Sequence, residues 1–421
     1  MRLVLSALVP LLGLFIWRSK YTLYYNILTL PDLPDGYYSE GNTSSLCSPM
    51  KSAPDPDFKH CEDLHLWDLH GPDGTVNERR VIVTCDSGRR KWNTVMGPLI
   101  DPHPSGSLWM HSTTSGQTTR LTLENFPQGH TFHPLGAEAY PSYSGNASYL
   151  YVVNHAKDKT VIEQFLISPS SSVAKYIRTL SHPFFISPNA IALTSPTSFY
   201  VTNDHVFTRR LPYIGSIVPI TETILGLPLS FTAHVTIDPD ETAEKPILSH
   251  TFAAPFVSFS NGVSISPSGL EVAIASSSLG RIYFYSRNTT TNALTFTTSV
   301  FVPFPPDNIG YDDEGNLIVA GHPHFPTLGK LVKNEIDVAP SWVVSVSPVA
   351  GETTTTQYDL KATFPASNII PSPGQNHTVS TLFQSNGKVF SSSCTAAKDS
   401  ISGNLYVSGL YAEQGVMICR S

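Results

Sequence analysis

The sequence has few charged residues and no concentrated positive charge. Asp, Glu, Lys and Arg make up 14% of the 421 residues, and the formal net charge is −7. The lack of a basic run argues against a nucleic-acid-binding protein, and a mildly acidic chain suits a bound cation better than an anion. Abundant Ser, Thr, Pro and Gly favour strands joined by turns over helices, which usually carry Glu, Lys and Ala.

No apolar stretch is long enough to be a standard membrane span. The N-terminal one runs from Leu3 to Trp17, 15 residues, with Arg18 directly after it, whereas a bilayer span needs ~20. A basic start and a short apolar stretch are typical of a signal sequence. Because no small-x-small cleavage site precedes Arg18, we expect residues 1–20 to be either a cleaved signal or an uncleaved anchor, with 21–46 a linker or helix.

Cysteine is scarce, and its spacing matches no zinc site. The five cysteines are Cys47, Cys61, Cys85, Cys394 and Cys419, an odd number that leaves one thiol over if the others pair. A bridge between Cys47 and Cys419 would close the chain into a ring. Cys61 starts one expected strand and Cys85 ends the next, and in an antiparallel pair the start of one strand faces the end of the other. A Cys61–Cys85 bridge would leave Cys394 free, unless both are simply small buried side chains.

Four N-x-[ST] triplets indicate passage through an oxidising, glycosylating compartment. They lie in polar stretches at Asn42, Asn146, Asn288 and Asn376. One such triplet carries no information, but four together with a signal-like N-terminus fit a glycoprotein. We therefore predict a protein of the secretory pathway, either extracellular or anchored with its folded part outside the cytoplasm.

A short pattern recurs along the chain: a polar residue, an apolar strand, a turn and a second apolar strand. It reads NAIAL then SFYVTNDH from Asn189, NGVSI then LEVAIASSS from Asn261, NIGY then NLIVAGH from Asn308, and EDLHLW then RVIVTC from Glu62. Similar segments begin near His133 and near FSSSC. Repeats holding about four strands each are typical of propeller blades. We predict an all-β, six-bladed β-propeller over 47–421, with an N-terminal apolar helix and an apolar insertion at 209–230. The alternative is a β-sandwich.

The polar residues that begin the repeats predict a calcium site. The first strand of each blade lines the central channel of a propeller, so these residues would converge at one mouth. They are Glu62, Asn189, Asn261, Asp307 and Asn308. Calcium takes roughly six to eight oxygen ligands, zinc prefers His and Cys, and magnesium keeps more water. Two carboxylates and three amides therefore predict calcium.

Histidines follow several of the expected strands. His155, His205 and His322 end or closely follow such strands. Because histidine titrates near neutral pH, we expect one of them to move a proton, although the pattern does not single one out. The insertion at 209–230 could pack into the core or form a lid or membrane-facing helix over the site.

Five motifs, in order and spacing, resemble the serum paraoxonase/arylesterase family of calcium-dependent ester and lactone hydrolases. They are CEDL at 61–64, YLYVVNH at 149–155, FYVTNDH at 199–205, FSNGVSISPSG at 259–269 and PDNIGYDDEGNLIVAGHP at 306–323. The resemblance implies a six-bladed propeller with two calcium ions in its tunnel. It assigns the catalytic ion to the five residues already named, and it implies a Cys47–Cys419 disulfide.

Two departures from the family pattern stand out. The second, structural calcium would use Asp63 and the backbone carbonyl of Ala137, but the chain has Ala190 where the family has an acidic residue. The resemblance also implies a catalytic histidine pair, of which His155 matches one member. The other position holds Leu135.

The missing histidine leaves the catalytic assignment open. His133, two residues before Leu135, could substitute for it, so we predict His155 and His133 as the catalytic pair. Phe259 and His322 match substrate-pocket positions of the family, and Leu135 would lie beside them.

The favoured hypothesis is calcium-dependent hydrolysis of a small-molecule ester or lactone, in which calcium polarises the carbonyl and a histidine activates water. Membrane association through the N-terminus is expected, and nucleic acid is not. One alternative is a calcium-stabilised binding module that has lost catalysis. Another is a gluconolactonase-like or strictosidine synthase-like propeller enzyme.

Overall fold

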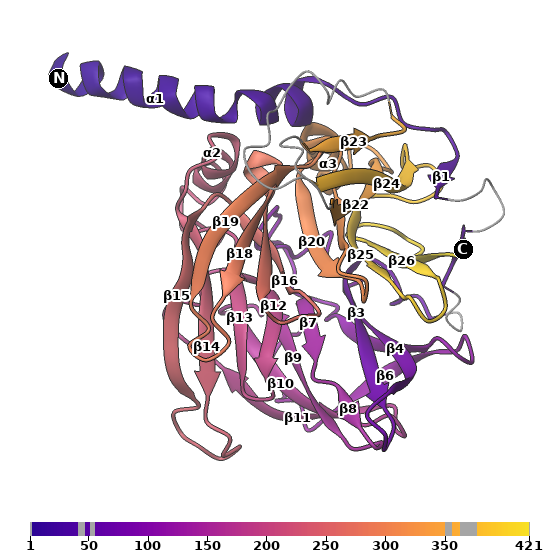
Figure 1. Cartoon of the computed structure of the whole chain (residues 1–421). Coiled ribbons are helices and arrows are strands. Elements are labelled where there is room, and N and C mark those ends of the chain that lie inside the picture. The colour runs from indigo at the N-terminus through magenta and orange to yellow at the C-terminus, as the bar shows by residue number, and fades with distance from the viewer. Residues whose placement is uncertain (1, 41–46, 51–54, 350–355, 363–376, 421) are drawn as a thin grey trace.

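Figure 1 shows the computed structural model, which describes residues 2–40, 47–50, 55–349, 356–362 and 377–420. Strands dominate it. The helical elements are α1 (Arg2–Thr22), the π-helix η1 (Leu23–Leu28), α2 (Val218–Ile224), the 3-10 helix η2 (Ser277–Leu279) and α3 (Phe325–Val332). The predicted N-terminal helix is therefore present, and it extends away from the body at the end of the molecule that carries α2 and α3 (Figure 1). Within the described part of the chain, none of the helices combines the length and hydropathy needed to cross a membrane.

Three sheets have four strands each. The first contains β12 (Pro188–Ser195), β13 (Ser198–Asn203), β14 (Ser230–Ile237) and β15 (Ile247–Val257). The second contains β16 (Ser260–Ile265), β17 (Glu271–Ser276), β18 (Arg281–Arg287) and β19 (Leu294–Phe301). The third contains β25 (Ser393–Lys398), β26 (Leu405–Gly409), β27 (Val416–Cys419) and β2 (Cys47–Pro49).

Two sheets are larger. The six-stranded sheet contains β20 (Pro306–Tyr311), β21 (Leu317–Gly321), β22 (Ser341–Pro348), β24 (His377–Ser385), β1 (Tyr37–Ser39) and β23 (Gln357–Asp359). The nine-stranded sheet contains β3 (Cys61–His70), β4 (Val76–Cys85), β5 (Ser107–Ser112), β6 (Thr118–Glu124), β7 (Pro134–Ala139), β8 (Ser142–Tyr143), β9 (Ser148–Asn154), β10 (Val161–Ile167) and β11 (Val173–Leu180). Within it, a short parallel pairing of β6 with β11 joins two antiparallel groups.

The first strands of the repeats surround one axis. β3 contacts β7, and the contacts continue through β12, β16, β20 and β25 back to β3. The prediction of an all-β, propeller-like fold is confirmed. The predicted count of six blades is not confirmed, because the described strands form five hydrogen-bonded sheets.

The hydrophobic core lies between neighbouring sheets. Ala273 and Phe284 of the β16–β19 sheet pack with Leu317 and Trp342 of the β20–β24 sheet, and all four side chains are buried. A near-continuous run of apolar residues lets a strand bury both faces, whereas alternation buries only one. Large buried aromatic rings supply much of this apolar area, which is the main stabilising contribution of the core.

Both predicted disulfides are present. Cys47 of β2 pairs with Cys419 of β27 over a sequence separation of 372, and this bond fastens an early strand to a late one. Cys61 and Cys85 face each other across β3 and β4 and are also bonded. Cys394 is a free, buried cysteine. Two disulfides in one chain indicate an oxidising compartment.

Candidate functional site

The predicted ligand residues occupy equivalent positions in their strands. Each is the second residue of a first strand of the repeat, and Asn308 follows Asp307 as the third. In every one of these strands the pairing register shifts at this point. Because such an irregularity bends the strand and re-aims the side chain, the fold turns a row of strand starts toward the axis. Leu135 holds the same position in β7.

These residues meet in one place. Glu62, Asn189, Asn261 and Asp307 line the same small cavity, together with Leu135, Phe259 and His322. The five predicted ligand side chains are at most 6% exposed. The structure thus brings four of the five together from four different strands, whereas Asn308 lines the neighbouring cavity and joins them through its hydrogen bond to Glu62.

Hydrogen bonds fix how the three amide groups face. The Asn261 amide nitrogen donates to the Asp307 carboxylate at 2.7 Å and to the Ser277 hydroxyl oxygen at 3.0 Å. The Asn308 nitrogen donates to Glu62 and to Thr395, each at 2.9 Å. The Asn189 amide nitrogen likewise donates to the Asp204 carboxylate, at 3.3 Å. In each case the NH₂ group is committed to the protein.

The opposite oxygens are left without partners. Among the described residues, no hydrogen-bond donor reaches Glu62 Oε2 or the Oδ1 atoms of Asn189, Asn261 and Asn308, although all four are buried. A buried acceptor left unsatisfied costs about 1–3 kcal/mol, so three on residues of the small cavity and a fourth on the adjoining Asn308 are a costly arrangement without a ligand. Hard oxygen donors of this kind suit a calcium ion.

The donor set is not a cluster of the His and Cys type. Within the described ranges, the structure contains no group of three or more His, Cys, Asp or Glu side chains that could hold a metal ion. The candidate set instead combines two carboxylates with three amides, so three of its five residues are neutral. It is the amide oxygens that distinguish this set from a purely acidic cluster.

Burial shapes the acid–base behaviour of the site. Burial raises the pKa of the Glu62 carboxyl well above its usual range, and the nearby charges of Asp63 and Asp307 raise it further. Burial likewise raises the pKa of Asp63 to about 7. Negative charge at these positions is therefore costly, and a nearby cation would offset that cost.

Asp63 faces a second cavity of about 220 Å³, which Ala137 and Ala190 also line. Its carboxylate oxygens accept backbone N–H groups from Leu64 at 2.9 Å and from Ala137 at 2.7 Å. Ala137 thus presents its amide, not its carbonyl, to Asp63. The second cation that the resemblance implies at this place stays a prediction.

His133 lies among other partners. Its Nδ1 is 2.9 Å from Asp86 Oδ2, and its Nε2 is 3.1 Å from the carbonyl oxygen of Pro102. The side chain is buried, and it does not line the small cavity. These contacts give His133 a structural environment, and its catalytic role stays a prediction.

His155 is also engaged at both ring nitrogens. Its Nε2 donates to the carbonyl of Pro188 at 2.6 Å, and its Nδ1 contacts the hydroxyl of Thr94. Pro188 directly precedes Asn189, so His155 positions the start of β12. Burial lowers the pKa of His155 to about 4. Its predicted role as a catalytic base remains a prediction.

The neutral, buried state of His155 makes stability depend on pH. An unfolded histidine titrates near 6.5, so between ~6.5 and ~4 the unfolded chain binds the additional proton and acid destabilises the fold. In His155→Gln, the free energy of unfolding should fall less with acid, by up to ~1.4 kcal/mol per pH unit across that window. Urea denaturation at about pH 7.5, 6.5 and 5.5 measures this.

The exposed His103 provides the matched control. His103→Gln should leave the pH dependence of the unfolding free energy as in the unmodified protein. An identical pH dependence in His155→Gln and the unmodified protein would show that His155 has the same pKa in the folded and the unfolded chain.

His322 differs from these two histidines. It lines the small cavity, and its Nε2 is 2.9 Å from Asp307 Oδ2. Its Nδ1 is buried and has no partner among the described residues. The Asp307 carboxylate therefore favours the tautomer with the proton on Nε2, which leaves the lone pair on Nδ1.

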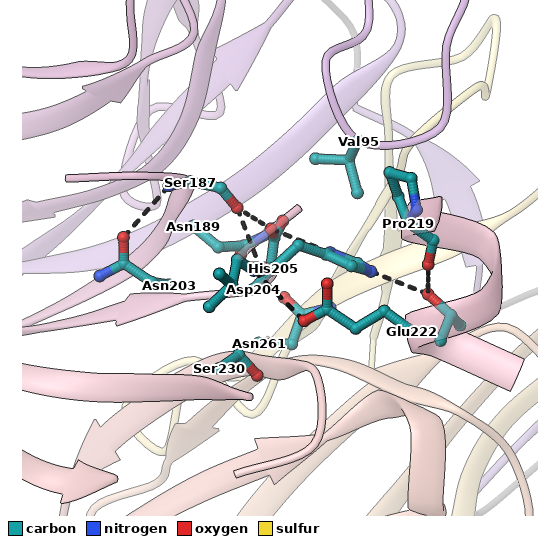
Figure 2. Close-up of polar contacts among 12 residues, drawn as sticks. Val95, Ser187, Asn189, Asn203, Asp204, His205, Pro219, Glu222, Ser230 and Asn261 are labelled. Carbon is teal, nitrogen blue, oxygen red and sulfur yellow. Dashed lines mark hydrogen bonds and ion pairs between the residues drawn. The ribbon is translucent and has the colours of Figure 1, made fainter. Parts of the chain in front are cut away.

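His205 links the strands to the insertion. Its Nδ1 is 3.1 Å from Asp204 Oδ1, and its Nε2 is 2.8 Å from the Thr223 hydroxyl on α2. Figure 2 shows His205 between Asp204 and the helix that carries Pro219 and Glu222. Asp204 also accepts the Asn189 amide at 3.3 Å. A continuous set of hydrogen bonds thus runs from a candidate ligand to α2.

The insertion lies over a large cavity of about 770 Å³, which includes Phe259, His205 and several residues of α2 and α3 in its wall. Apolar side chains of the insertion are exposed, among them Tyr213 at 99% and Ile217 at 66%. Packing into the core does not account for such side chains. The insertion therefore forms part of a wall over the candidate site.

Phe259 belongs to both cavities. Its backbone has φ = 52°, a conformation that a bulky residue rarely adopts. Its ring lies 4.4 Å from the His205 ring, edge to face. Non-glycine residues in this conformation cluster at functional sites. Phe259 lies in a cavity wall, and its role in a substrate pocket stays a prediction.

Of the four predicted glycosylation sites, two can be placed. Asn146 and Asn288 are exposed in turns, as a glycan requires. Asn42 and Asn376 lie outside the described residues. Glycosylation stays a prediction.

Sequence reasoning missed the residues that orient the amides. Asp204, Ser277 and Thr395 each accept a hydrogen bond from an asparagine of the set. Asp204 lies in the VTNDH segment, in which the sequence predicted a functional role only for His205. Ser277 and Thr395 carry no signal of their own, because serine and threonine are abundant throughout the chain.

Comparison with known proteins places these features in a family. Residues 98–362, more than half of the chain, match the family model Arylesterase. The chain is 32% identical to serum paraoxonase/arylesterase 1 of Homo sapiens over 200 residues, which cover 46% of this chain and 50% of that one. It is 25% identical to serum paraoxonase/arylesterase 2 of Bos taurus over 287 residues, covering 67% and 69%.

The match spans about half the length of the first of these relatives. A luciferin-regenerating enzyme of known structure aligns to 86% of this chain and 91% of that one, at 12% identity and a TM-score of 0.45, too low a similarity to support an argument. The family model and the curated relatives agree with each other. The chain belongs to the arylesterase family.

Proposed function

We propose that this protein is a calcium-dependent hydrolase of small-molecule esters or lactones. The observation that carries the proposal is the set of four unpartnered, buried oxygens on Glu62, Asn189, Asn261 and Asn308. Together with the Asp307 carboxylate they have the hard oxygen chemistry that calcium prefers. The names of the curated relatives, paraoxonase and arylesterase, supply the reaction class.

These five residues would hold one ion. A bound calcium would polarise the ester carbonyl and stabilise negative charge on its oxygen. The second ion that the resemblance implies has less support, because the Asp63 carboxylate already accepts two backbone amides. We therefore propose a single calcium ion at the functional site.

We propose His322 as the residue that accepts a proton from the attacking water. Its unpartnered Nδ1 and its place in the cavity wall support this role. Asp307 orients the ring through Nε2. His155 would then act as a positioning residue, holding Pro188 and with it the start of β12.

The larger cavity would take the organic part of the substrate. Its wall includes Met96, Ile220, Ile224 and Phe325, which would shield the reacting bond from bulk water. Exclusion of water strengthens electrostatic interactions in a site of this kind.

The finer points of architecture and location also belong to the proposal. We propose six blades, counting the nine-stranded sheet as two, and the closed ring of contacts through β3, β7, β12, β16, β20 and β25 supports this count. The two disulfides support passage through the secretory pathway. Membrane association through the N-terminus stays a prediction.

One observation favours the alternative of a calcium-stabilised binding module. Both ring nitrogens of His133 and of His155 are already engaged with the protein, so the predicted pair has no free nitrogen for water. The same cavities would then bind a ligand without hydrolysing it.

Chelation distinguishes the two candidates. Purified protein should hydrolyse phenyl acetate and δ-valerolactone in calcium, and EGTA should reduce the rate by at least ~10²-fold. Restoring calcium should restore the rate. Hydrolysis that is indifferent to EGTA would refute the calcium mechanism, and calcium binding without any hydrolysis would favour the binding module.

A further inference from the structure

The large cavity combines an apolar wall with positive charge. Three of its lining residues are Arg90, Arg209 and Lys333. Among the described residues that line it, there is no aspartate or glutamate. Since the chain as a whole carries a formal net charge of −7, this concentration of cations is a local feature and does not follow from general basicity.

Arg209 has only weak partners. Its Nε donates to the carbonyl of Val95 at 3.3 Å and its Nη1 to that of Ser216 at 3.4 Å. It makes no ion pair with any carboxylate in the described part of the chain. Burial lowers the pKa of Arg209, and no neighbouring charge opposes this shift.

Arg90 and Lys333 also lack a carboxylate. Arg90 donates to the carbonyl of Leu331 at 3.2 Å and to Asn334 Oδ1 at 2.8 Å. Lys333 follows α3 and is exposed. Across the described ranges, neither takes part in an ion pair. The cavity thus has three cationic groups whose charges no acidic side chain neutralises.

Arg90 and Arg209 are partly buried, and a partly buried cation without a counter-charge is unfavourable in an apolar setting. A guanidinium also presents several N–H donors in a fork that matches a carboxylate. An anionic group on the bound molecule would supply the missing counter-charge, while the apolar wall would contact a hydrocarbon chain. These two requirements together describe an amphiphilic substrate.

We propose that the preferred substrate is an ester or lactone that carries a carboxylate, separated from the reacting bond by an aliphatic chain. This inference rests on the proposed hydrolase function. Arg209 and Lys333 bind the carboxylate, Arg90 adds to the positive potential, and the wall of Met96, Ile220 and Ile224 contacts the chain. The opposing explanation is that the arginines only tie together the loops around the cavity.

Two esters of equal chain length test the proposal. Mono-4-nitrophenyl suberate ends in a carboxylate, and 4-nitrophenyl octanoate ends in a methyl group. We expect the charged ester to have a kcat/KM about tenfold higher, mainly through a lower KM, since a cation can donate hydrogen bonds to the carboxylate but not to the methyl end. Equal values, or a preference for the neutral ester, would overturn the proposal and leave the hydrolase function intact.

Substitutions assign the effect to the cations. Arg209→Gln and Lys333→Gln should each lower kcat/KM for the suberate about tenfold and change that for the octanoate less than about twofold. Lys330→Gln is the matched control, because Lys330 is also exposed and on α3 but does not line the cavity. Equal losses on both esters would show that the arginine only supports the loops. Lys333→Gln, at an exposed position, keeps the test decisive if Arg209→Gln fails to fold.

A binding measurement separates this inference from the hydrolase function. If neither ester is hydrolysed, the function fails, but calorimetry with decanoate and decan-1-ol still reports on the cavity. Decanoate should bind about tenfold more tightly, and Lys333→Gln should remove the difference. Equal binding of the acid and the alcohol would overturn the inference.

Discussion

Replacing Glu62 with glutamine is expected to lower kcat/KM for phenyl acetate on the order of 10³-fold, as loss of a group that stabilises developing charge does in other enzymes. Glu62 Oε1 accepts the Asn308 amide at 2.9 Å, whereas Oε2 has no donor among the described residues. Glutamine keeps the shape and can keep the first contact. It places a neutral group, or an N–H donor, where the cation needs an anionic oxygen.

The same substitution should not unfold the protein. Because burial raises the pKa of the Glu62 carboxyl well above its usual range, a neutral side chain is favoured there when no cation is bound. In EGTA, Glu62→Gln should therefore be at least as stable as the unmodified protein. In calcium it should be less stable, because a ligand that binds only the native state stabilises it by about 2.7 kcal/mol at a hundred times its dissociation constant.

Thermal unfolding with and without calcium, combined with calorimetric titration of calcium, measures both effects. Glu244→Gln serves as the control, because Glu244 is exposed and does not line the cavity of the candidate site. Retention of normal calcium affinity in Glu62→Gln would remove Glu62 from the ligand set. Full ester hydrolysis by that variant would refute the proposed mechanism.

Removing the Cys47–Cys419 disulfide is expected to have the largest effect on stability. In the chain-entropy description, a bond that closes a longer loop restricts the unfolded chain more, and a loop of about 100 residues is worth about 4.7 kcal/mol. Here the separation is 372, whereas that of Cys61–Cys85 is 24. Replacing the first pair with alanine should cost about 2 kcal/mol more than replacing the second.

Guanidinium unfolding of the two double variants under identical conditions provides the comparison. Alanine is chosen because Cys61 and Cys85 are fully buried, and a polar replacement would add a cost unrelated to the bond. If the Cys61/Cys85 variant were the less stable of the two, local packing around β3 and β4 would contribute more to the free energy of unfolding than closure of the long loop does.

The sequence alone was sufficient for many of the strands and for the shared strand position of the candidate ligand residues, whose role as ligands stays a prediction. In the sequence, Glu62, Asn189 and Asn261 each begin an apolar strand. In the structure, each is the second residue of its strand. The pairing of Cys61 with Cys85 was predictable for a similar reason, since the start of one strand faces the end of the next.

The partners of the histidines could not be predicted in this way. His155 contacts a carbonyl 33 residues away, and His133 contacts one 31 residues away. Carbonyl groups have no sequence signature, so no pattern distinguishes a histidine held by the backbone from one that faces a cavity. Only the structure shows that the Nε2 atom of His322 contacts Asp307, while its Nδ1 atom has no partner among the described residues.

The number of separate sheets was equally inaccessible. The short parallel pairing of β6 with β11 merges strands of two repeats into one sheet. It depends on how closely two outer strands approach after each repeat has folded. That distance depends on the side chains packed between the repeats, which a pattern of polar and apolar residues does not specify.

The pairing of β2 with β27 has a consequence for biosynthesis. A ribosome releases Cys47 long before Cys419. Strand β2 therefore stays without its partner strand, and Cys47 without its disulfide partner, while most of the protein is made. During that interval, Cys61 and Cys85 emerge and offer Cys47 nearer partners. Correct maturation therefore requires that any bond with these neighbours be rearranged, and thiol–disulfide exchange in the compartment where the chain folds becomes part of the route to the finished ring.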